Sequence, residues 1–164
     1  MKVVVTLTKK FFDAHPRAGE PTNFADLVKQ GKKIHTCRDN FNYWIDKIAL
    51  MKNVGGTLCI REWSGRPYRS PQDTIMEVPA DITGVSELIL QRSKHQVLPY
   101  RHSVDCYWAT IDGEKVDIET LARNDGFKNQ RDFTAFFDPL FDKYQRDILR
   151  LAIIHFTAYS YGKK

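Results

Sequence analysis

The chain has few cysteines, no long hydrophobic run and no repeated segment. Its three cysteines are odd in number and widely separated, so they fit the reduced thiols of a cytoplasmic protein better than a disulfide framework. The longest apolar runs are short, such as Leu151–Ile154, and a membrane span is therefore not expected. Met1–Thr8 alternates valines with small polar residues, which predicts a strand rather than a signal peptide.

Several motifs that carry catalytic chemistry are also missing. The sequence has no Walker A loop, no glycine fingerprint for a dinucleotide and no nucleophile elbow of a serine hydrolase. His35 and Cys37 are two residues apart, but the other cysteines and histidines are isolated. Since metal sites usually show paired cysteines or closely spaced helical histidines, we expect neither a metal nor a cofactor.

What the chain does have is enough apolar material for one core and an excess of positive charge. With 164 residues, of which 42% are hydrophobic, a single domain over residues 1–164 is expected. The formal net charge is +5, which favours an anionic partner without proving one.

The segment GKKIHTCRDN, Gly31–Asn40, brings three cations, a histidine, a threonine and an aspartate together in a short connector between two predicted helices. If Lys33–Arg38 is extended, Lys33, His35 and Cys37 share one face of the strand. Such a density of cations, donors and one hydroxyl suits a pocket for an anion or a nucleobase. The alternative is a solvated basic loop.

Lys33 and Thr36 have a spacing that suggests covalent chemistry. A desolvated, neutral lysine could activate the threonine hydroxyl for attack, and a carboxylic acid elsewhere would protonate the leaving group. Asp125, beside Gly126, is one candidate for that acid. The alternative role for Asp125 is that of an ordinary turn residue.

A second cluster interleaves aromatic residues with arginines, at Trp63, Arg66, Tyr68 and Arg69. Aromatic rings can stack on bases while arginines pair with phosphates. The alternative is that Trp63 and Tyr68 are core or rim residues of a sheet.

Hydrophobic periodicity and turn residues predict an α+β domain. Strands are predicted at Met1–Thr8, Thr57–Trp63, Asp73–Val78, Gly84–Gln91, Cys106–Ile111 and Leu149–Tyr159, with Asp73–Val78 and Gly84–Gln91 in one meander. Helices are predicted over Asn23–Gln30 after a Thr22 cap, from Phe41 past Met51 after an Asn40 cap, from Asp117 to about Asn124, and along Phe133–Phe141 with a break at Pro139. The polar, basic segment Arg92–Ser103 is predicted to be a flexible insertion. The expected architecture is a curled, mostly antiparallel sheet or small β-barrel flanked by helices.

The segment GKKIHTCRDN resembles the motif of ASCH domains, which belong to the PUA-like superfamily. Three further stretches agree with this resemblance, namely LCIREWSGRPYRSPQ (Leu58–Gln72), LARNDGFKNQRDFTAFF (Leu121–Phe137) and AIIHFTAYSY (Ala152–Tyr161). Together they span nearly the whole chain, which looks like a group of bacterial and phage ASCH-like proteins. The resemblance implies a small, partly open PUA-like β-barrel flanked by helices.

The resemblance also implies a function. ASCH domains are generally proposed to bind RNA or modified nucleosides in a cleft beside the barrel. One branch hydrolyses N4-acetylcytidine, and its motif of lysine, threonine, arginine and aspartate falls on Lys33, Thr36, Arg38 and Asp39. This implies Thr36 as nucleophile, Lys33 as its activator and Arg38 as a cation in the cleft. The third catalytic residue of that branch, a glutamate, falls at Asp125 by approximate alignment.

We therefore expect a cytoplasmic ASCH-type domain that binds RNA or a modified nucleoside in a basic cleft. The residues expected to contact nucleic acid are Lys32, His35, Arg38, Asp39, Arg61, Trp63, Arg66, Tyr68 and Arg69. One alternative is a hydrolase, either an amidohydrolase on an acylated nucleoside or a ribonuclease, with Lys33, Thr36 and Asp125 as catalytic residues. Another is a bacterial or phage protein-interaction module.

Overall fold

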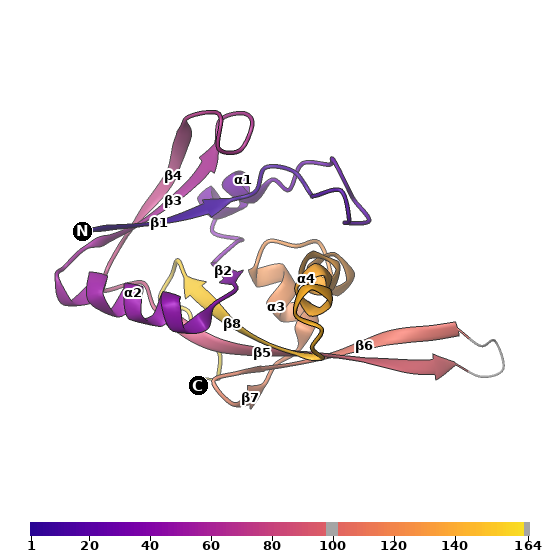
Figure 1. The fold of residues 1–164 in the computed structure, drawn as a ribbon. Coiled ribbons are helices and arrows are strands. Elements are labelled where there is room, and N and C mark those ends of the chain that lie inside the picture. The colour runs from indigo at the N-terminus through magenta and orange to yellow at the C-terminus, as the bar shows by residue number, and fades with distance from the viewer. Residues whose placement is uncertain (98–101, 163–164) are drawn as a thin grey trace.

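The protein folds into two β-sheets and helices that pack against them (Figure 1). The structure, a computed structural model, describes residues 1–97 and 102–162. The first sheet has three strands, in the order β1 (Lys2–Leu7), β3 (Thr57–Trp63) and β4 (Gln72–Pro79). The second has five, in the order β2 (His35–Arg38), β8 (Ile148–His155), β5 (Val85–Val97), β6 (His102–Ile111) and β7 (Glu114–Lys115). The helices are α1 (Phe24–Lys29), α2 (Phe41–Asn53), α3 (Ile118–Asn124) and α4 (Gln130–Tyr144).

The fold confirms a mixed α+β architecture but not one closed barrel. Strand β1 runs parallel to β3, while the other pairings are antiparallel. Strands β4 and β5 were expected to be neighbours in one meander, yet β4 pairs with β3 and β5 pairs with β6 and β8. Within the described residues, no strand pairing joins the two sheets. Strand propensity does not specify a partner, so this pairing could not be read from the sequence.

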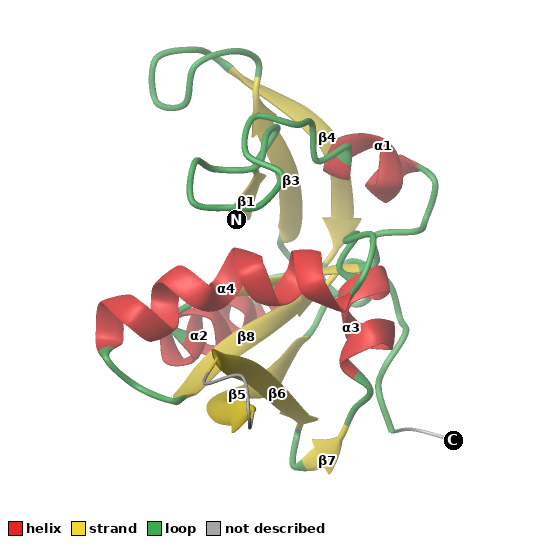
Figure 2. Ribbon diagram, turned by 90° about the vertical axis from the view of Figure 1, so that its right-hand side faces the viewer, coloured by secondary structure: helices red, strands yellow, loops and turns green. Residues whose placement is uncertain are grey.

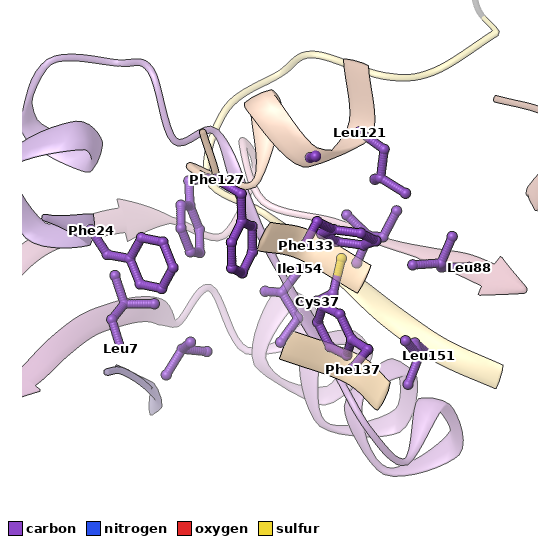
Figure 3. Close-up of a cluster of buried hydrophobic side chains, with 14 of the residues drawn as sticks. Leu7, Phe24, Cys37, Leu88, Leu121, Phe127, Phe133, Phe137, Leu151 and Ile154 are labelled. Carbon is purple, nitrogen blue, oxygen red and sulfur yellow. The ribbon is translucent and has the colours of Figure 1, made fainter. Parts of the chain in front are cut away.

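One hydrophobic core extends across both sheets and all four helices, and part of it lies between the five-stranded sheet and α4 (Figures 2 and 3). Helix α4 places Phe133, Phe137 and Phe141 on one face, at a spacing of four residues, and all three are buried. Leu151 of β8 and Leu88 of β5 are fully buried against them. The same packing fixes one wall of the site described below.

The predicted flexible insertion is largely β-structure. Arg92 through Val97 continue β5, and pairing with β6 extends to the pair Val97 and His102. Residues 98–101 of the predicted insertion lie outside the described residues. Side-chain polarity did not predict the strands at residues 92–97 and 102–103, because a hairpin satisfies its backbone hydrogen bonds through the neighbouring strand whatever side chains it carries.

Pro139 lies inside α4 and does not interrupt it, contrary to the expected break. Proline removes one backbone hydrogen bond and strains the preceding turn. The buried phenylalanine face of α4 continues on both sides of Pro139, and its packing holds the helix together. Among the described residues, no helix is long and apolar enough to span a membrane.

Candidate functional site

Helix α1 ends in a turn that returns the chain toward the interior. Gly31 has φ +70°, and the N–H groups of Gly31 and Lys32 donate to the carbonyls of Val28 and Leu27. This is the Schellman arrangement, in which glycine adopts the left-handed conformation at little cost. The turn leads the chain into the buried residue Lys33, just before β2.

Helix α3 ends in the same type of turn. Gly126 follows Asp125 with φ +86°, and the N–H groups of Gly126 and Phe127 donate to the carbonyls of Arg123 and Ala122. Phe127 is buried and anchors the chain after the turn. The last residue of this helix end, Asp125, is thereby held inside the protein, where it is 1% exposed.

The two turns meet in a buried ion pair. The Nζ of Lys33 lies 2.7 Å from Oδ1 of Asp125 and also donates to the backbone carbonyl of Asp125. The backbone strengthens this junction, because the N–H of Ile34 donates to the carbonyl of Asn124. Nζ of Lys33 also lies 4.3 Å from the ring centre of Phe24, within the range of a cation–π interaction.

Burial and pairing shift the pKa values of Lys33 and Asp125 in opposite directions. Burial lowers the pKa of Lys33 below its ordinary value, and the attraction of Asp125 offsets this only in part. Burial alone would raise the pKa of Asp125, but Lys33 and the neighbouring His35 together lower it. The exchangeable proton therefore belongs to Lys33, whereas the sequence pattern suggested Asp125 as the proton donor.

His35 links this pair to the C-terminal segment. Its Nδ1 lies 3.6 Å from Oδ1 of Asp125, and its Nε2 lies 2.6 Å from the hydroxyl of Tyr161. That hydroxyl accepts a hydrogen bond from the side-chain amide of Asn124, so it can donate its own proton to Nε2 and leave the ring proton on Nδ1, facing Asp125. His35 is fully buried, and thus stands behind the ion pair rather than at the surface.

Thr36 and the ion pair line one small cavity, which we call the Lys33 cavity. Its volume is about 10 Å³, roughly the space of one water molecule. Its lining consists of Leu7, Thr8, Phe24, Lys33, Thr36, Cys37, Arg38, Asp125, Phe127, Phe136 and Phe137. The fold therefore brings Lys33, Thr36 and Asp125, which the sequence suggested as a group, to one point.

A wider groove of about 360 Å³ adjoins this cavity and is called here the Arg38 groove. Its lining consists of Phe12, Ala14, Cys37, Arg38, Asp39, Phe136, Phe137, Pro139 and Leu140. The groove and the cavity share Cys37, Arg38, Phe136 and Phe137. Arg38 donates to the carbonyl of Thr6, and Asp39 accepts from the hydroxyl of Tyr144.

The second predicted cluster lies on the turn between β3 and β4. Tyr68 is 89% exposed and is therefore not a core residue, and its ring centre lies 5.2 Å from that of the half-buried Trp63. A hollow of about 470 Å³, called here the Trp63 hollow, is lined by Thr8, Lys9, Lys10, Trp63, Ser64, Gly65, Arg66 and Pro67. Arg69 is exposed on the same turn.

The two remaining predicted contacts lie apart from these hollows. Lys32 is exposed in the turn after α1. Arg61 is half-buried in β3, and its Nε is enclosed with no hydrogen-bond partner among the described residues. Neither side chain lines the Lys33 cavity, the Arg38 groove or the Trp63 hollow.

One group of side chains has the composition of a metal site. A ring nitrogen of His35, Sγ of Cys37 and a carboxylate oxygen of Asp125 lie within 4.8 Å of one another. However, the ammonium of Lys33 already contacts that carboxylate. Burial raises the pKa of the Cys37 thiol, whereas a metal requires the thiolate. This group therefore suits a hydrogen-bonded core better than a cation site.

Another hollow, of about 610 Å³, lies along β6 and α3. It includes Gln91, Trp108 and Ile118, and none of the sequence-predicted site residues. Its charged lining residues, Lys115 and Asp117, are both exposed. It therefore lacks the buried, paired charges that mark the Lys33 cavity.

Sequence reasoning missed Phe12, Ala14 and Tyr161 as parts of the site. Phe12 and Ala14 come from the irregular segment between β1 and α1, which carries no periodic pattern. Tyr161 lies after the last strand, and its only signal was its place in the closing stretch that resembles ASCH domains.

Replacing Gly126 with alanine is expected to destabilise the protein more than a left-handed alanine normally does. A Cβ at this position would lie 3.0 Å from Cδ of Lys33, whose head group is fixed by Asp125. Gly113→Ala is the matched control, because Gly113 has φ +85° and no atom within 4 Å of such a Cβ. We expect the control to cost about 1–2 kcal/mol in urea unfolding, and Gly126→Ala at least about 1 kcal/mol more. Equal costs would show that Lys33 is free to move.

His155 makes stability depend on pH. Its Nε2 lies 2.8 Å from the hydroxyl of Ser86, and burial, together with the nearby His35, lowers its pKa to about 4. The pKa of this ring is 6.5 in the unfolded chain and about 4 in the folded protein. Between these two pH values, the unfolded state therefore binds more protons than the folded state.

The free energy of unfolding should therefore fall as the pH drops from 6.5 toward 4, by on the order of 3 kcal/mol for this residue. His155→Gln should remove that part of the dependence. Urea unfolding of both proteins at several pH values measures it, and an unchanged slope in the variant would assign the effect to other groups.

Comparison with models of known protein families, with curated proteins and with solved structures finds no match to this chain. The arrangement of Lys33, Thr36 and Asp125 around one cavity is therefore the main structural basis for a functional proposal.

Proposed function

We propose that this protein binds RNA or a modified nucleoside, with the base in the Arg38 groove and its polar edge toward the Lys33 cavity. The groove volume of about 360 Å³ lies in the range of small-ligand sites. Phe12, Phe136 and Phe137 supply aromatic walls, which suit a planar base. Arg38 and Asp39 supply a donor and an acceptor at the rim.

The observation that carries this proposal is the buried ion pair beside the groove. Taking Lys33 and Asp125 out of water is costly, and a buried ion pair often stabilises a fold no more than apolar residues of similar size would. A pair placed at a cavity that shares four lining residues with an aromatic groove is therefore better explained by contact with a polar ligand.

The finer fold assignment belongs to the same proposal. We assign the chain to the ASCH-type, PUA-like class because its four motif stretches occur in order and two sheets with flanking helices surround one core. A cytoplasmic location is part of this proposal, supported by three cysteines that are all free thiols.

Filling the groove tests the binding function. Ala14 is exposed and lines the groove, so Ala14→Phe should block it without disturbing the core. Calorimetric titration with cytidine, N4-acetylcytidine and a short single-stranded RNA should show at least tenfold weaker binding to this variant. Ala18→Phe is the matched control, because Ala18 is exposed in the same segment but is outside the groove lining. Equal binding by both variants, or no binding by the wild type at low salt, would refute the proposal.

A second candidate, an amidohydrolase acting on an acylated nucleoside, is favoured by the convergence of Lys33, Thr36 and Asp125. Before the first step, the ammonium of Lys33, whose pKa is lowered by burial, must release its proton to solvent. Oγ1 of Thr36 then bonds to the acyl carbon while the neutral Lys33 amine takes the hydroxyl proton. The carbon–nitrogen bond then breaks, and the Lys33 ammonium protonates the leaving amine. Water hydrolyses the threonine ester to release the acid. Asp125 remains ionised and orients Lys33.

A further inference from the structure

Within the described residues, the turn between β3 and β4 and the segment after β1 present three cations that have no acidic partner. Lys10, Arg66 and Arg69 are exposed, and their side chains make no hydrogen bond or ion pair in the part of the chain that the structure describes. Lys9 contacts Glu62 at 3.8 Å and donates to the carbonyl of Ser64. The Trp63 hollow is thus lined by three cations, and of these only Lys9 has an acidic partner in the described part of the chain.

The same turn holds an aromatic ring in the solvent. Tyr68 has φ +62°, a left-handed conformation that is costly for a bulky side chain. The turn is closed by its own hydrogen bonds, since Ser70 Oγ accepts from the N–H of Gly65 and donates to the carbonyl of Arg66. A preformed loop therefore presents Tyr68 beside Trp63, as a platform on which a base can stack.

One segment connects this turn with the proposed nucleoside site. The chain after β1 passes between the β3–β4 turn and α4 (Figures 1 and 2). Along this segment, Thr8 lines both the Trp63 hollow and the Lys33 cavity, Lys10 lines the hollow, and Phe12 lines the Arg38 groove. The cationic hollow and the aromatic groove therefore lie on neighbouring parts of one surface.

We propose that the ligand is a single-stranded RNA chain rather than a free nucleoside, with its phosphodiester backbone in the Trp63 hollow and one nucleotide in the Arg38 groove. This inference rests on the binding function proposed above. The phosphates neutralise Lys10 and Arg66, and a neighbouring base stacks on Tyr68. A free nucleoside has no phosphate and reaches only the groove.

The test compares one nucleoside with one oligonucleotide on the same variants. Lys10→Gln combined with Arg66→Gln should weaken binding of a dye-labelled single-stranded RNA about tenfold or more at low salt. Loss of two phosphate contacts should also reduce the slope of log affinity against log salt by about 1.4. Calorimetry should show unchanged affinity for cytidine. Lys29→Gln combined with Lys115→Gln removes the same charge at exposed positions outside the hollow, and should change neither slope nor cytidine affinity.

Tyr68→Gly gives a readout that misfolding cannot imitate. Glycine tolerates the positive φ, so the free energy of unfolding in urea should stay the same or rise, while RNA affinity falls about tenfold through lost stacking.

If RNA binding by the Lys10 and Arg66 double variant equals that of the control, the backbone site is refuted although cytidine still binds. Absence of cytidine binding to the wild type would instead refute the function on which this inference rests. A single-stranded DNA of the same sequence shows whether the ribose hydroxyl contributes.

Discussion

Replacing Lys33 with methionine is expected to lower the free energy of unfolding by about 3–5 kcal/mol, measured by urea denaturation at pH 7. The substitution preserves most of the side-chain volume, but it leaves the carboxylate of Asp125 buried without its cation. Asp125 is 1% exposed, so bulk water does not solvate its carboxylate in place of the lost ammonium. The loss should shrink at low pH, where Asp125 becomes protonated and no longer needs a partner.

The double variant Lys33→Met with Asp125→Leu separates the cost of an unpaired charge from the value of the pair. Because apolar replacement of a buried ion pair is often neutral or stabilising, the double variant should recover most of the stability lost in the single variant. It should not recover binding of a nucleoside. Full recovery of binding would show that the pair serves only the fold. If Lys33→Met instead left the free energy of unfolding unchanged, Asp125 would not be held as a buried carboxylate.

Replacing Thr36 with valine is expected to abolish deacylation of N4-acetylcytidine, with at least about a thousandfold loss of turnover, if the hydrolase candidate holds. Valine has nearly the shape of threonine but no hydroxyl, so no acyl-enzyme ester can form. Thr36 is 3% exposed and lies in β2. Valine is β-branched like threonine, so the shape of the buried side chain is kept. Stability should therefore change by less than about 1 kcal/mol.

Thr36→Ser is the matched control for the Thr36→Val variant. Serine keeps the nucleophilic oxygen, so a substantial part of the acetate release should remain, together with a trapped acyl-enzyme detectable by mass spectrometry. Acetate release by Thr36→Val at the wild-type rate would remove Thr36 from the chemistry. A wild-type protein that binds N4-acetylcytidine without releasing acetate would leave the binding function as the sole proposal.

Local sequence determined the ends of several elements. Asn40 was predicted to cap the second helix, and its side chain accepts a hydrogen bond from the N–H of Tyr43 at the start of α2. Gly31 was predicted to end the first helix, and Thr57–Trp63 was predicted as a strand with the bounds that β3 has. These features depend on residues close in sequence, through capping groups, left-handed glycine and alternating side chains.

Contacts distant in sequence decided the rest. Lys33 and Asp125 are separated by 92 positions, and their pairing depends on how α1 and α3 are placed, although the ASCH resemblance had suggested the same partners. The continuous hairpin at Arg92, the unbroken helix at Pro139 and the division into two sheets all result from tertiary pairing and packing that override local preference. The sequence alone predicted which residues are candidates for a functional site and where most elements begin. Only the tertiary structure decided that Lys33, Thr36 and Asp125 share one buried cavity, because desolvation and pairing depend on neighbours that the chain brings together by folding.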